Sequence, residues 1–336
     1  MSADGAILVV GPRWIGDMVM AQTLFAALKD RQPRAPIDVI APKWAGPLLA
    51  RMPEVRDWID APFVADRLEF GLRRRIGRAL RGRYASAYVL PGSWKSALVP
   101  FFARIPRRVG YLREFRYGLL TEPKPLPTDI RRRTAEAFHA LAGEASFRNP
   151  RLVPDRSNRD ALLARHGLAG PAGFAAMMPG AEFGPAKRWP ERFYAELAGA
   201  LMRRGFGIVL LGSAKDAAVT GEVARIAPGA IDLAGKTRLE DAIDILSAAR
   251  LAVTNDSGLM HVAAAVGVPV VGIYGSTSPD NTPPLTEHRE LLTLRLSCSP
   301  CHARECPLGH MNCLNQLAPS TVHDAVDRLL AATQAS

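Results

Sequence analysis

Residues 254–261, with the sequence T-N-D-S-G-L-M-H, have the composition of an anion-binding turn. They lie between an apolar strand predicted at 251–253 and an Ala-rich helix. The first backbone N–H groups of a helix have no intrahelical partner, and the helix dipole favours negative charge there. We therefore expect Ser257 to cap the helix, Gly258 to make room, and a phosphate to dock on the turn. The alternative is that Asp256 or Ser257 only caps the helix, since both residue types are common at that position.

Asp256 narrows the class of ligand. A carboxylate beside a phosphate repels it, unless the carboxylate faces another part of the ligand or bonds a hydroxyl. A sugar nucleotide satisfies both demands, because it carries a diphosphate and hydroxyl groups. The turn therefore favours a nucleotide-sugar site.

A second loop, residues 179–190, has the sequence P-G-A-E-F-G-P-A-K-R-W-P and follows a predicted strand. Its glycines and prolines favour a defined turn, which brings Lys187 and Arg188 to the end of that strand. Fixed cations can stabilise the negative charge that develops on a diphosphate leaving group. The alternative is that Lys187 is a solvated loop lysine.

A third loop, residues 11–17, follows the first predicted strand with the sequence G-P-R-W-I-G-D. It lacks the G-x-G-x-x-G dinucleotide fingerprint and the G-K-[ST] ending of a phosphate-binding loop, which disfavours nicotinamide, flavin and ATP chemistry. Asp17 begins an otherwise apolar helix and is a candidate general base. The alternative is a helix-terminal carboxylate that only interacts with the dipole.

Strands alternate with helical patterns along the chain, as in parallel sheets with crossover helices. Strands are predicted at 6–10, 37–41, 87–90, 174–178, 208–211, 231–233, 251–253 and 268–274. Helices are predicted at 17–31, 66–81, 94–103 and 155–166, and from near Pro190, Lys215, Leu239 and Ser257. The length of 336 residues suits two α/β domains. A Pro- and Gly-rich linker at 149–173 places them at 1–160 and 161–336, with the ligand site in a cleft between them.

Positive charge is concentrated in the first half of the chain. Residues 1–160 contain 28 Lys and Arg against 16 Asp and Glu, a net charge of +12, whereas residues 161–336 contain 15 against 16, a net charge of −1. Such a field attracts nucleic acid, an anionic membrane surface or an acidic glycolipid. No apolar run is long enough to span a bilayer, and the N-terminus lacks the basic region of a signal peptide. We expect a cytoplasmic protein.

Four cysteines follow the last strong strand with the spacing C-x2-C-x4-C-x6-C. They are Cys298, Cys301, Cys306 and Cys313. In a cytoplasmic protein such a segment suggests a structural metal, with zinc suited to four thiolates. Free thiols or disulfides are the alternatives.

Together, these loops resemble the ADP-heptose:lipopolysaccharide heptosyltransferases of glycosyltransferase family 9, and the type II members most closely. Further similarity lies in Y-V-L-P-G-S-W-K-S-A-L-V-P-F-F (88–102), G-S-A-K-D (212–216) and S-P-D-N-T-P-P (278–284). The resemblance covers most of the chain. It implies a GT-B fold, in which two doubly wound Rossmann-like domains face a central cleft. The N-terminal domain would bind the acceptor and the C-terminal domain ADP-heptose.

The resemblance also implies roles for individual residues. Asp17 would be the catalytic base and Lys187 a phosphate contact, in an inverting transfer that needs no cofactor. The donor would be bound by Lys187, Asp216, Asp256, Ser257, Gly258, Leu259, Met260 and His261. Candidate acceptor-binding residues in the basic half are Arg13, Trp14, Ser93, Lys95, Arg113 and Arg116. A histidine such as His261 on an apolar helix is equally a core residue.

The acceptor would be the lipopolysaccharide inner core that carries its first heptose on Kdo2-lipid A. This implies peripheral contact with the inner face of the inner membrane. Alternatives are a type I or III heptosyltransferase with a different acceptor, and a nucleotide-sugar epimerase on the same fold. An RNA-binding module is disfavoured, because the chain lacks an aromatic-interleaved RNA-binding motif. We expect no nucleic-acid partner.

Overall fold

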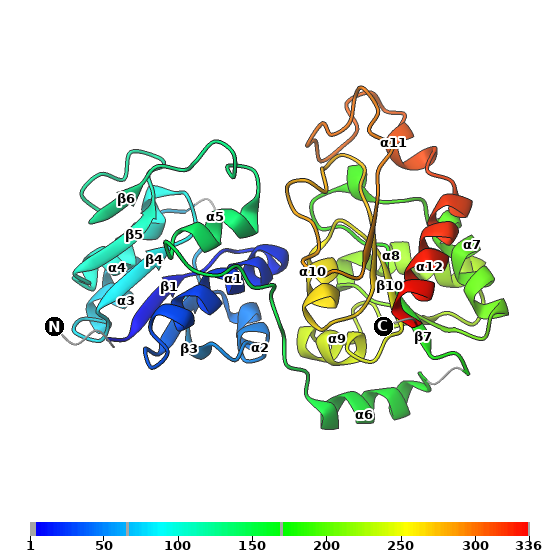
Figure 1. Ribbon diagram of the computed structural model, residues 1–336, viewed down its shortest axis with the longest axis horizontal. Coiled ribbons are helices and arrows are strands. Elements are labelled where there is room, and N and C mark those ends of the chain that lie inside the picture. The colour runs from blue at the N-terminus through cyan, green and yellow to red at the C-terminus, as the bar shows by residue number, and fades with distance from the viewer. Residues whose placement is uncertain (1–4, 65–66, 169–170, 335–336) are drawn as a thin grey trace. The chain divides into compact units, whose positions relative to one another are not determined.

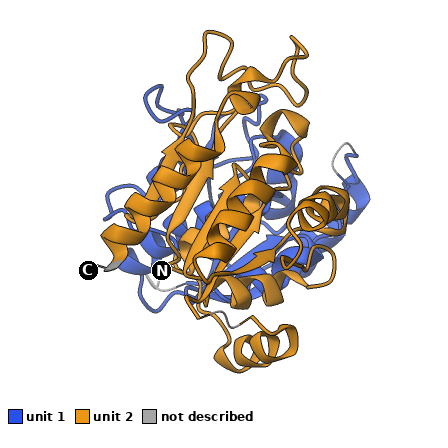
Figure 2. Ribbon diagram, turned by 90° about the vertical axis from the view of Figure 1, so that its right-hand side faces the viewer, with its two compact units in different colours: residues 1–150 blue, residues 151–336 orange. Residues whose placement is uncertain are grey.

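The computed structural model describes residues 5–64, 67–168 and 171–334. The chain divides into two compact units, unit 1 (residues 1–150) and unit 2 (residues 151–336) (Figure 1; Figure 2). Two predictions fall outside the described residues. They are the absence of a signal peptide, which involves residues 1–4, and the start of a helix at Asp66. None of the helices in the described ranges is long and apolar enough to cross a membrane.

Unit 1 is built on a six-stranded sheet in the order β3-β2-β1-β4-β5-β6, with all neighbouring strands parallel. The strands are β1 (Ile7–Val10), β2 (Ile37–Ala41), β3 (Val55–Asp60), β4 (Ser86–Val89), β5 (Arg107–Tyr111) and β6 (Glu122–Lys124). Every residue of β1, β2 and β4 is buried, as expected for parallel strands covered on both faces. This is the strand order of a Rossmann fold, and its topological switch point lies between β1 and β4.

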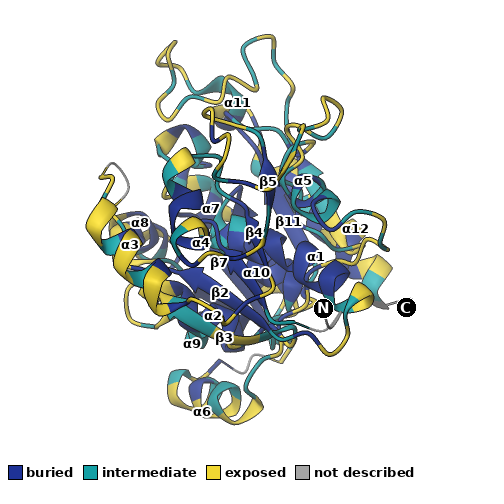
Figure 3. Cartoon of the chain, turned by 90° about the vertical axis from the view of Figure 1, so that its left-hand side faces the viewer, coloured by how far each residue is buried: buried dark blue, intermediate teal, exposed yellow. Residues whose placement is uncertain are grey.

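The helices of unit 1 are α1 (Ile15–Arg31), α2 (Gly46–Leu49), α3 (Phe70–Ala79), α4 (Leu98–Phe102) and α5 (Thr134–Ala140). Short 3-10 turns precede α2 and α4, namely η1 (Lys43–Ala45) and η2 (Trp94–Ala97). Twelve of the seventeen residues of α1 are buried, because α1 lies between the sheet and α5. The Thr23 hydroxyl donates to the Ala135 carbonyl at 3.0 Å and joins α1 to α5. In contrast, α3 exposes a broad face (Figure 3).

Unit 2 repeats the topology. Its sheet has the order β12-β11-β10-β7-β8-β9, all parallel. The strands are β7 (Phe174–Met178), β8 (Gly207–Leu210), β9 (Ile231–Asp232), β10 (Leu251–Asn255), β11 (Val270–Ile273) and β12 (Arg289–Leu292). The switch point of this sheet lies between β7 and β10, the first and fourth strands of the unit.

The helices of unit 2 are α6 (Arg156–His166), α7 (Glu191–Arg203), α8 (Ala217–Ile226), α9 (Leu239–Leu246), α10 (Gly258–Ala265), α11 (Asn312–Asn315) and α12 (Pro319–Gln334). Two 3-10 turns, η3 (Pro185–Lys187) and η4 (Ala214–Asp216), follow β7 and β8. The core contains Trp189 and Tyr194, both fully buried, packed with side chains of β7, β8, β10, α7 and α12. The centres of their rings lie 4.9 Å apart in an edge-to-face arrangement.

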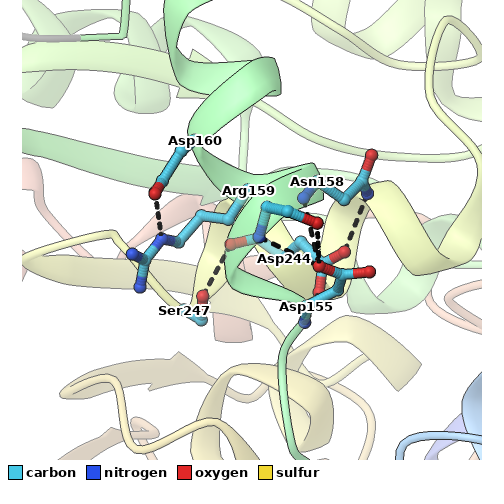
Figure 4. A network of polar contacts seen from close by, with 7 residues as sticks. Asp155, Asn158, Arg159, Asp160, Asp244 and Ser247 are labelled. Atoms are coloured by element: carbon cyan, nitrogen blue, oxygen red, sulfur yellow. Dashed lines mark hydrogen bonds and ion pairs between the residues drawn. The ribbon is translucent and has the colours of Figure 1, made fainter.

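The first helix of unit 2, α6, is fixed by a polar network (Figure 4). Asp155 caps α6 by accepting from the backbone N–H groups of Ser157 and Asn158. The Asp244 carboxylate on α9 accepts from the Asp155 backbone N–H and from the Asn158 amide, each at 2.8 Å. Because these bonds attach α6 to α9, the chain divides at 150/151 rather than at the predicted 160/161.

Most predicted elements are present, with ends that differ by a few residues. The segment predicted as one helix at 94–103 is a 3-10 turn followed by α4, and Pro100 lies within that helix. Four strands were not predicted. They are β3, β5, β6 and β12, each of which contains charged residues and is at least partly exposed.

Candidate functional site

The loops that follow β7 and β10 meet at the switch point of the second sheet. The Lys187 ammonium, in η3, lies 2.6 Å from Asp256 Oδ2, just after β10. The Thr277 hydroxyl, in the loop after β11, donates to the same oxygen at 2.6 Å. The side chains of Lys187 and Asp256 are 13% and 6% exposed. Three loops at one edge of the sheet are therefore tied together by one carboxylate, where ligands bind in open α/β sheets.

The Lys187–Asp256 pair changes the electrostatics expected from each residue alone. Lys187 neutralises the carboxylate that would otherwise repel a phosphate, and its ammonium also lies 3.4 Å from the Asp256 carbonyl oxygen and 4.9 Å from the centre of the Phe183 ring. An ammonium has three N–H donors, so Lys187 can still donate to a ligand while it is paired with Asp256. Thr277 was not predicted. Its signal in the sequence was its place in the loop that follows a buried strand.

The N-terminus of α10 has the open geometry of an anion-binding turn. The expectation that Ser257 caps this helix is wrong, because its side chain makes no capping bond and instead lies 3.3 Å from the Thr254 hydroxyl. Ser257, Gly258 and Leu259 are partly exposed, whereas the Met260 side chain is buried. The backbone N–H groups of the first turn are therefore not bonded by a capping side chain and can donate to an anion.

His261 is part of the core. It is 5% exposed, and burial lowers its pKa to about 4, with Asp256 opposing this shift and Lys187 adding to it. The imidazole is therefore neutral near pH 7. Of the two roles considered for His261, the structure favours the buried core residue over a direct donor contact.

Asp216 holds the turn after β8. Its Oδ2 accepts from the Ser213 backbone N–H at 2.9 Å and from the Ser213 hydroxyl at 2.8 Å. A Cβ at Gly180 would lie 2.2 Å from Asp216 Oδ1, and one at Gly212 would lie 2.9 Å from its Cβ. Glycine is therefore required at both positions for the close approach of the loops that follow β7 and β8. The geometry gives Asp216 a local structural role.

Asn255, the last residue of β10, holds the loop that carries Lys187. Its role was not predicted. Asn255 is fully buried. Its Oδ1 accepts from the Trp189 backbone N–H at 3.1 Å and the Tyr194 hydroxyl at 3.0 Å, and its Nδ2 donates to the Pro179 carbonyl at 2.6 Å. One amide thereby fixes both ends of the loop that carries Lys187.

The cysteine-rich segment, residues 298–313, packs directly on that loop. The Arg304 carbonyl accepts from the Ala186 backbone N–H at 3.0 Å, and the His302 backbone N–H donates to the Ser276 carbonyl at 2.7 Å. The residues adjacent to Lys187 and Thr277 are therefore held by main-chain bonds to this segment.

All four cysteines, Cys298, Cys301, Cys306 and Cys313, are free thiols. Burial, and then electrostatic interaction with Cys298, Cys301 and Cys306, raises the pKa of Cys313. A bond from the Met311 backbone N–H is the main cause that lowers the pKa of Cys306. Within the described ranges, no three His, Cys, Asp or Glu side chains form a group that could hold a metal ion. The structural zinc inferred from the cysteine spacing stays a prediction.

In unit 1, the predicted residues gather at the switch point of the first sheet. Asp17 lies in the first turn of α1, the helix that follows β1. Arg13 and Trp14 precede it and are exposed. Ser93 and Lys95 follow β4, the neighbouring parallel strand. Since the carboxyl ends of parallel strands share one edge, these residues border one surface.

Arg116 does not present its guanidinium to that surface. It is 1% exposed and donates to the carbonyls of Tyr111 and Pro91 and to the Ser96 hydroxyl. Burial lowers its pKa to about 10, with the nearby Arg113 adding to the shift, so it remains charged at neutral pH. The prediction that Arg116 binds an acceptor directly is wrong, because its donors tie the loop after β4 to the loop after β5. Arg113 itself is exposed.

Comparisons with known proteins agree with this geometry. Residues 73–312 match the model of the family described as glycosyltransferase family 9 (heptosyltransferase). The chain is 42% identical to lipopolysaccharide heptosyltransferase 2 of Salmonella typhimurium, over 97% of this chain and 98% of that protein. A solved structure of the E. coli ADP-heptose LPS heptosyltransferase II is 40% identical, with a TM-score of 0.86 over 98% of this chain and 99% of that one.

A glycosyltransferase family 9 structure from Veillonella parvula shares the fold at 20% identity, with a TM-score of 0.87 over 99% of both chains. These likenesses confirm the predicted GT-B class, with two Rossmann-like sheets. The chain belongs to glycosyltransferase family 9, the heptosyltransferases.

Proposed function

We propose that this family 9 member transfers L-glycero-D-manno-heptose from ADP-heptose to the first heptose of the lipopolysaccharide inner core and releases ADP. The observation that carries the proposal is the 42% identity to a lipopolysaccharide heptosyltransferase 2 over nearly the full length of both chains. Relatives of types 1 and 3 match only 36% and 30% of this chain, each at 35% identity. This difference favours the type II acceptor.

In this proposal, unit 2 binds the donor. The diphosphate docks on the N-terminus of α10, where the backbone N–H groups of Gly258 and Leu259 can donate to it. Lys187 contributes positive charge from the opposite loop. Asp256, which is ion-paired with Lys187, faces the heptose and accepts a hydrogen bond from one of its hydroxyls. Asp216, in η4 after β8, is the candidate for the ribose hydroxyls.

Unit 1 binds the acceptor at the edge that carries the loops after β1, β4 and β5. Its net positive charge suits an inner core that is rich in carboxylates. Arg13, Trp14, Ser93, Lys95 and Arg113 are the candidate contacts. Arg116 contributes indirectly, because it positions the loops that carry Ser93 and Arg113.

Asp17 is the proposed base. It takes the proton of the acceptor hydroxyl as that oxygen attacks the anomeric carbon of the donor. The bond from that carbon to the phosphate oxygen breaks, ADP leaves with the electron pair, and the anomeric centre is inverted. Charge on the leaving diphosphate is stabilised by Lys187 and the first turn of α10. No cofactor is required in this scheme.

The acceptor is a lipid, so the proposal places the enzyme at the cytoplasmic face of the inner membrane in peripheral, reversible contact. The test is product analysis by mass spectrometry with three acceptors, which carry no heptose, one heptose or two heptoses on Kdo2-lipid A. A product that gains one heptose from the one-heptose acceptor alone supports type II. Gain on the heptose-free acceptor indicates type I and gain on the two-heptose acceptor type III. Conversion of ADP-heptose without any acceptor indicates an epimerase.

A further inference from the structure

The loop after β5 carries two unusually exposed aromatic side chains. Phe115 is 89% exposed and Tyr117 is 67% exposed. Trp94, in the loop after β4, is 40% exposed and is joined to this loop by its backbone N–H, which donates to the Glu114 carboxylate at 3.0 Å. We call residues 113–117 the aromatic tip. Single exposed apolar residues are common, but the aromatic tip has two within three residues.

The backbone of the aromatic tip is held in a costly conformation. Glu114 and Phe115 have consecutive φ values of 47° and 50°, a left-handed region that side chains other than glycine rarely adopt. Such strain persists only where the surroundings impose it. Here the buried Arg116 guanidinium imposes it, because it bonds the Tyr111 carbonyl before the tip and the Pro91 carbonyl of the neighbouring loop. The structure thus fixes Phe115 outward instead of letting it fold back on the protein.

The aromatic tip lies at the same edge of the sheet as Asp17. It follows β5, which is parallel to β4, and β4 is parallel to β1. The exposed charged groups at this edge of the sheet include two arginines. Arg13 and Arg113 are exposed, and the one carboxylate of the tip, Glu114, is turned back to Trp94. Exposed aromatic rings beside arginines match the interface of a bilayer with anionic headgroups, where Phe and Tyr bury their rings and arginine meets phosphate.

We propose that Phe115 and Tyr117 insert into the interface of an anionic lipid bilayer and hold the acceptor-binding edge of unit 1 against the membrane. This inference rests on the proposed function in one respect, since a lipid-anchored acceptor requires that edge to approach the bilayer. Within the aromatic tip, Phe115 and Tyr117 are membrane contacts and take no part in the transfer reaction.

The first test measures binding of the full chain to vesicles of phosphatidylethanolamine with and without phosphatidylglycerol, in the absence of substrates. Phe115→Ser is expected to lower the partition coefficient on anionic vesicles about tenfold, because one aromatic side chain is no longer buried. Phe147→Ser is the matched control. Phe147 is a phenylalanine of the same unit that is 42% exposed, and its loss should leave binding unchanged. Equal binding by Phe115→Ser and the unchanged chain, or an equal loss in both variants, overturns the proposal.

A second variant reports insertion directly. Phe115→Trp places a fluorophore at the tip, and its difference spectrum against the unchanged chain, which has five tryptophans, should shift to shorter wavelength on anionic vesicles. No shift overturns the proposal.

Transfer assays separate the two proposals. Phe115→Ser should lower kcat/KM for the one-heptose acceptor in vesicles and leave kcat/KM unchanged for the same core oligosaccharide freed of lipid A. An equal loss on both acceptors means that Phe115 binds the sugar, which overturns the membrane role. If no acceptor supports transfer, the proposed function fails, while the vesicle measurements still decide the role of the aromatic tip.

Discussion

Replacing His261 with glutamine should remove a large part of the acid sensitivity of unit 2. Burial lowers the pKa of His261 from 6.5 to about 4. Between these two pH values the unfolded chain binds a proton that the folded chain does not, so stability rises with pH. The contribution of the neutral imidazole is fully present above about pH 6.5 and is lost as the pH falls toward 4.

The magnitude follows from the same two values. The full difference corresponds to about 3 kcal/mol, at about 1.4 kcal/mol per pH unit. Most of this change in stability has occurred by about pH 5, where the free energy of unfolding is about 2 kcal/mol lower than at about pH 7.5. Asp256 favours the imidazolium and Lys187 disfavours it, so both charges must be retained in the variant that is compared.

The assay is urea unfolding followed by tryptophan fluorescence at about pH 7.5 and about pH 5. The signal of unit 2 comes from Trp189, which lies in its core. When the pH is lowered between these values, the free energy of unfolding of His261→Gln should fall by about 2 kcal/mol less than that of the unchanged chain. His288→Gln, at an exposed position, is the matched control and should follow the unchanged chain. Parallel pH dependence in His261→Gln and the unchanged chain would refute the assignment of His261 as a buried neutral residue.

Two further predictions concern the residues that shape the donor site. Lys187→Ala should weaken ADP binding and lower turnover, each at least tenfold, because the Asp256 carboxylate, 6% exposed, loses its counter-charge and repels the diphosphate. Calorimetric titration with ADP checks this, with the exposed Lys236→Ala as control, and unchanged ADP affinity in Lys187→Ala would contradict it. Asn255→Leu should lower the free energy of unfolding by about 3 kcal/mol or more, because three hydrogen bonds of a fully buried amide are lost. Denaturant titration measures this against the exposed Asn149→Leu, and a loss below about 1 kcal/mol would count against the role of Asn255.

The sequence was most informative where apolar runs end sharply. β1, β7 and β10 are short buried strands, and the segment after each contains a residue that was singled out, namely Asp17, Lys187 and Asp256. The edge strand β3 escaped prediction because its residues, V-R-D-W-I-D, are partly exposed and polar. Such strands are defined by pairing with a neighbour, here β2, and pairing is not visible in a local pattern.

Residue type alone was a weaker guide within the site. Arg116 was assigned to the acceptor as a residue of the basic half, yet its guanidinium is buried and donates to the Tyr111 and Pro91 carbonyls. Asn255 and Thr277 were overlooked because their importance comes from contacts across loops that are distant in sequence. Ser257 has the residue type and position of a helix cap, and its hydroxyl nevertheless lies against Thr254. These differences depend on tertiary geometry, which local propensity does not contain.

The most direct test of the account is ADP release from ADP-heptose by the unchanged chain and by Asp17→Asn, each with and without the one-heptose acceptor. If the chain is an acceptor-dependent transferase, the unchanged chain releases ADP only when the acceptor is present. The account also predicts that Asp17→Asn loses most of this release while it binds ADP as before, because the base lies in unit 1 and the donor site in unit 2. Wild-type release by Asp17→Asn, or release that does not depend on the acceptor, would contradict the account.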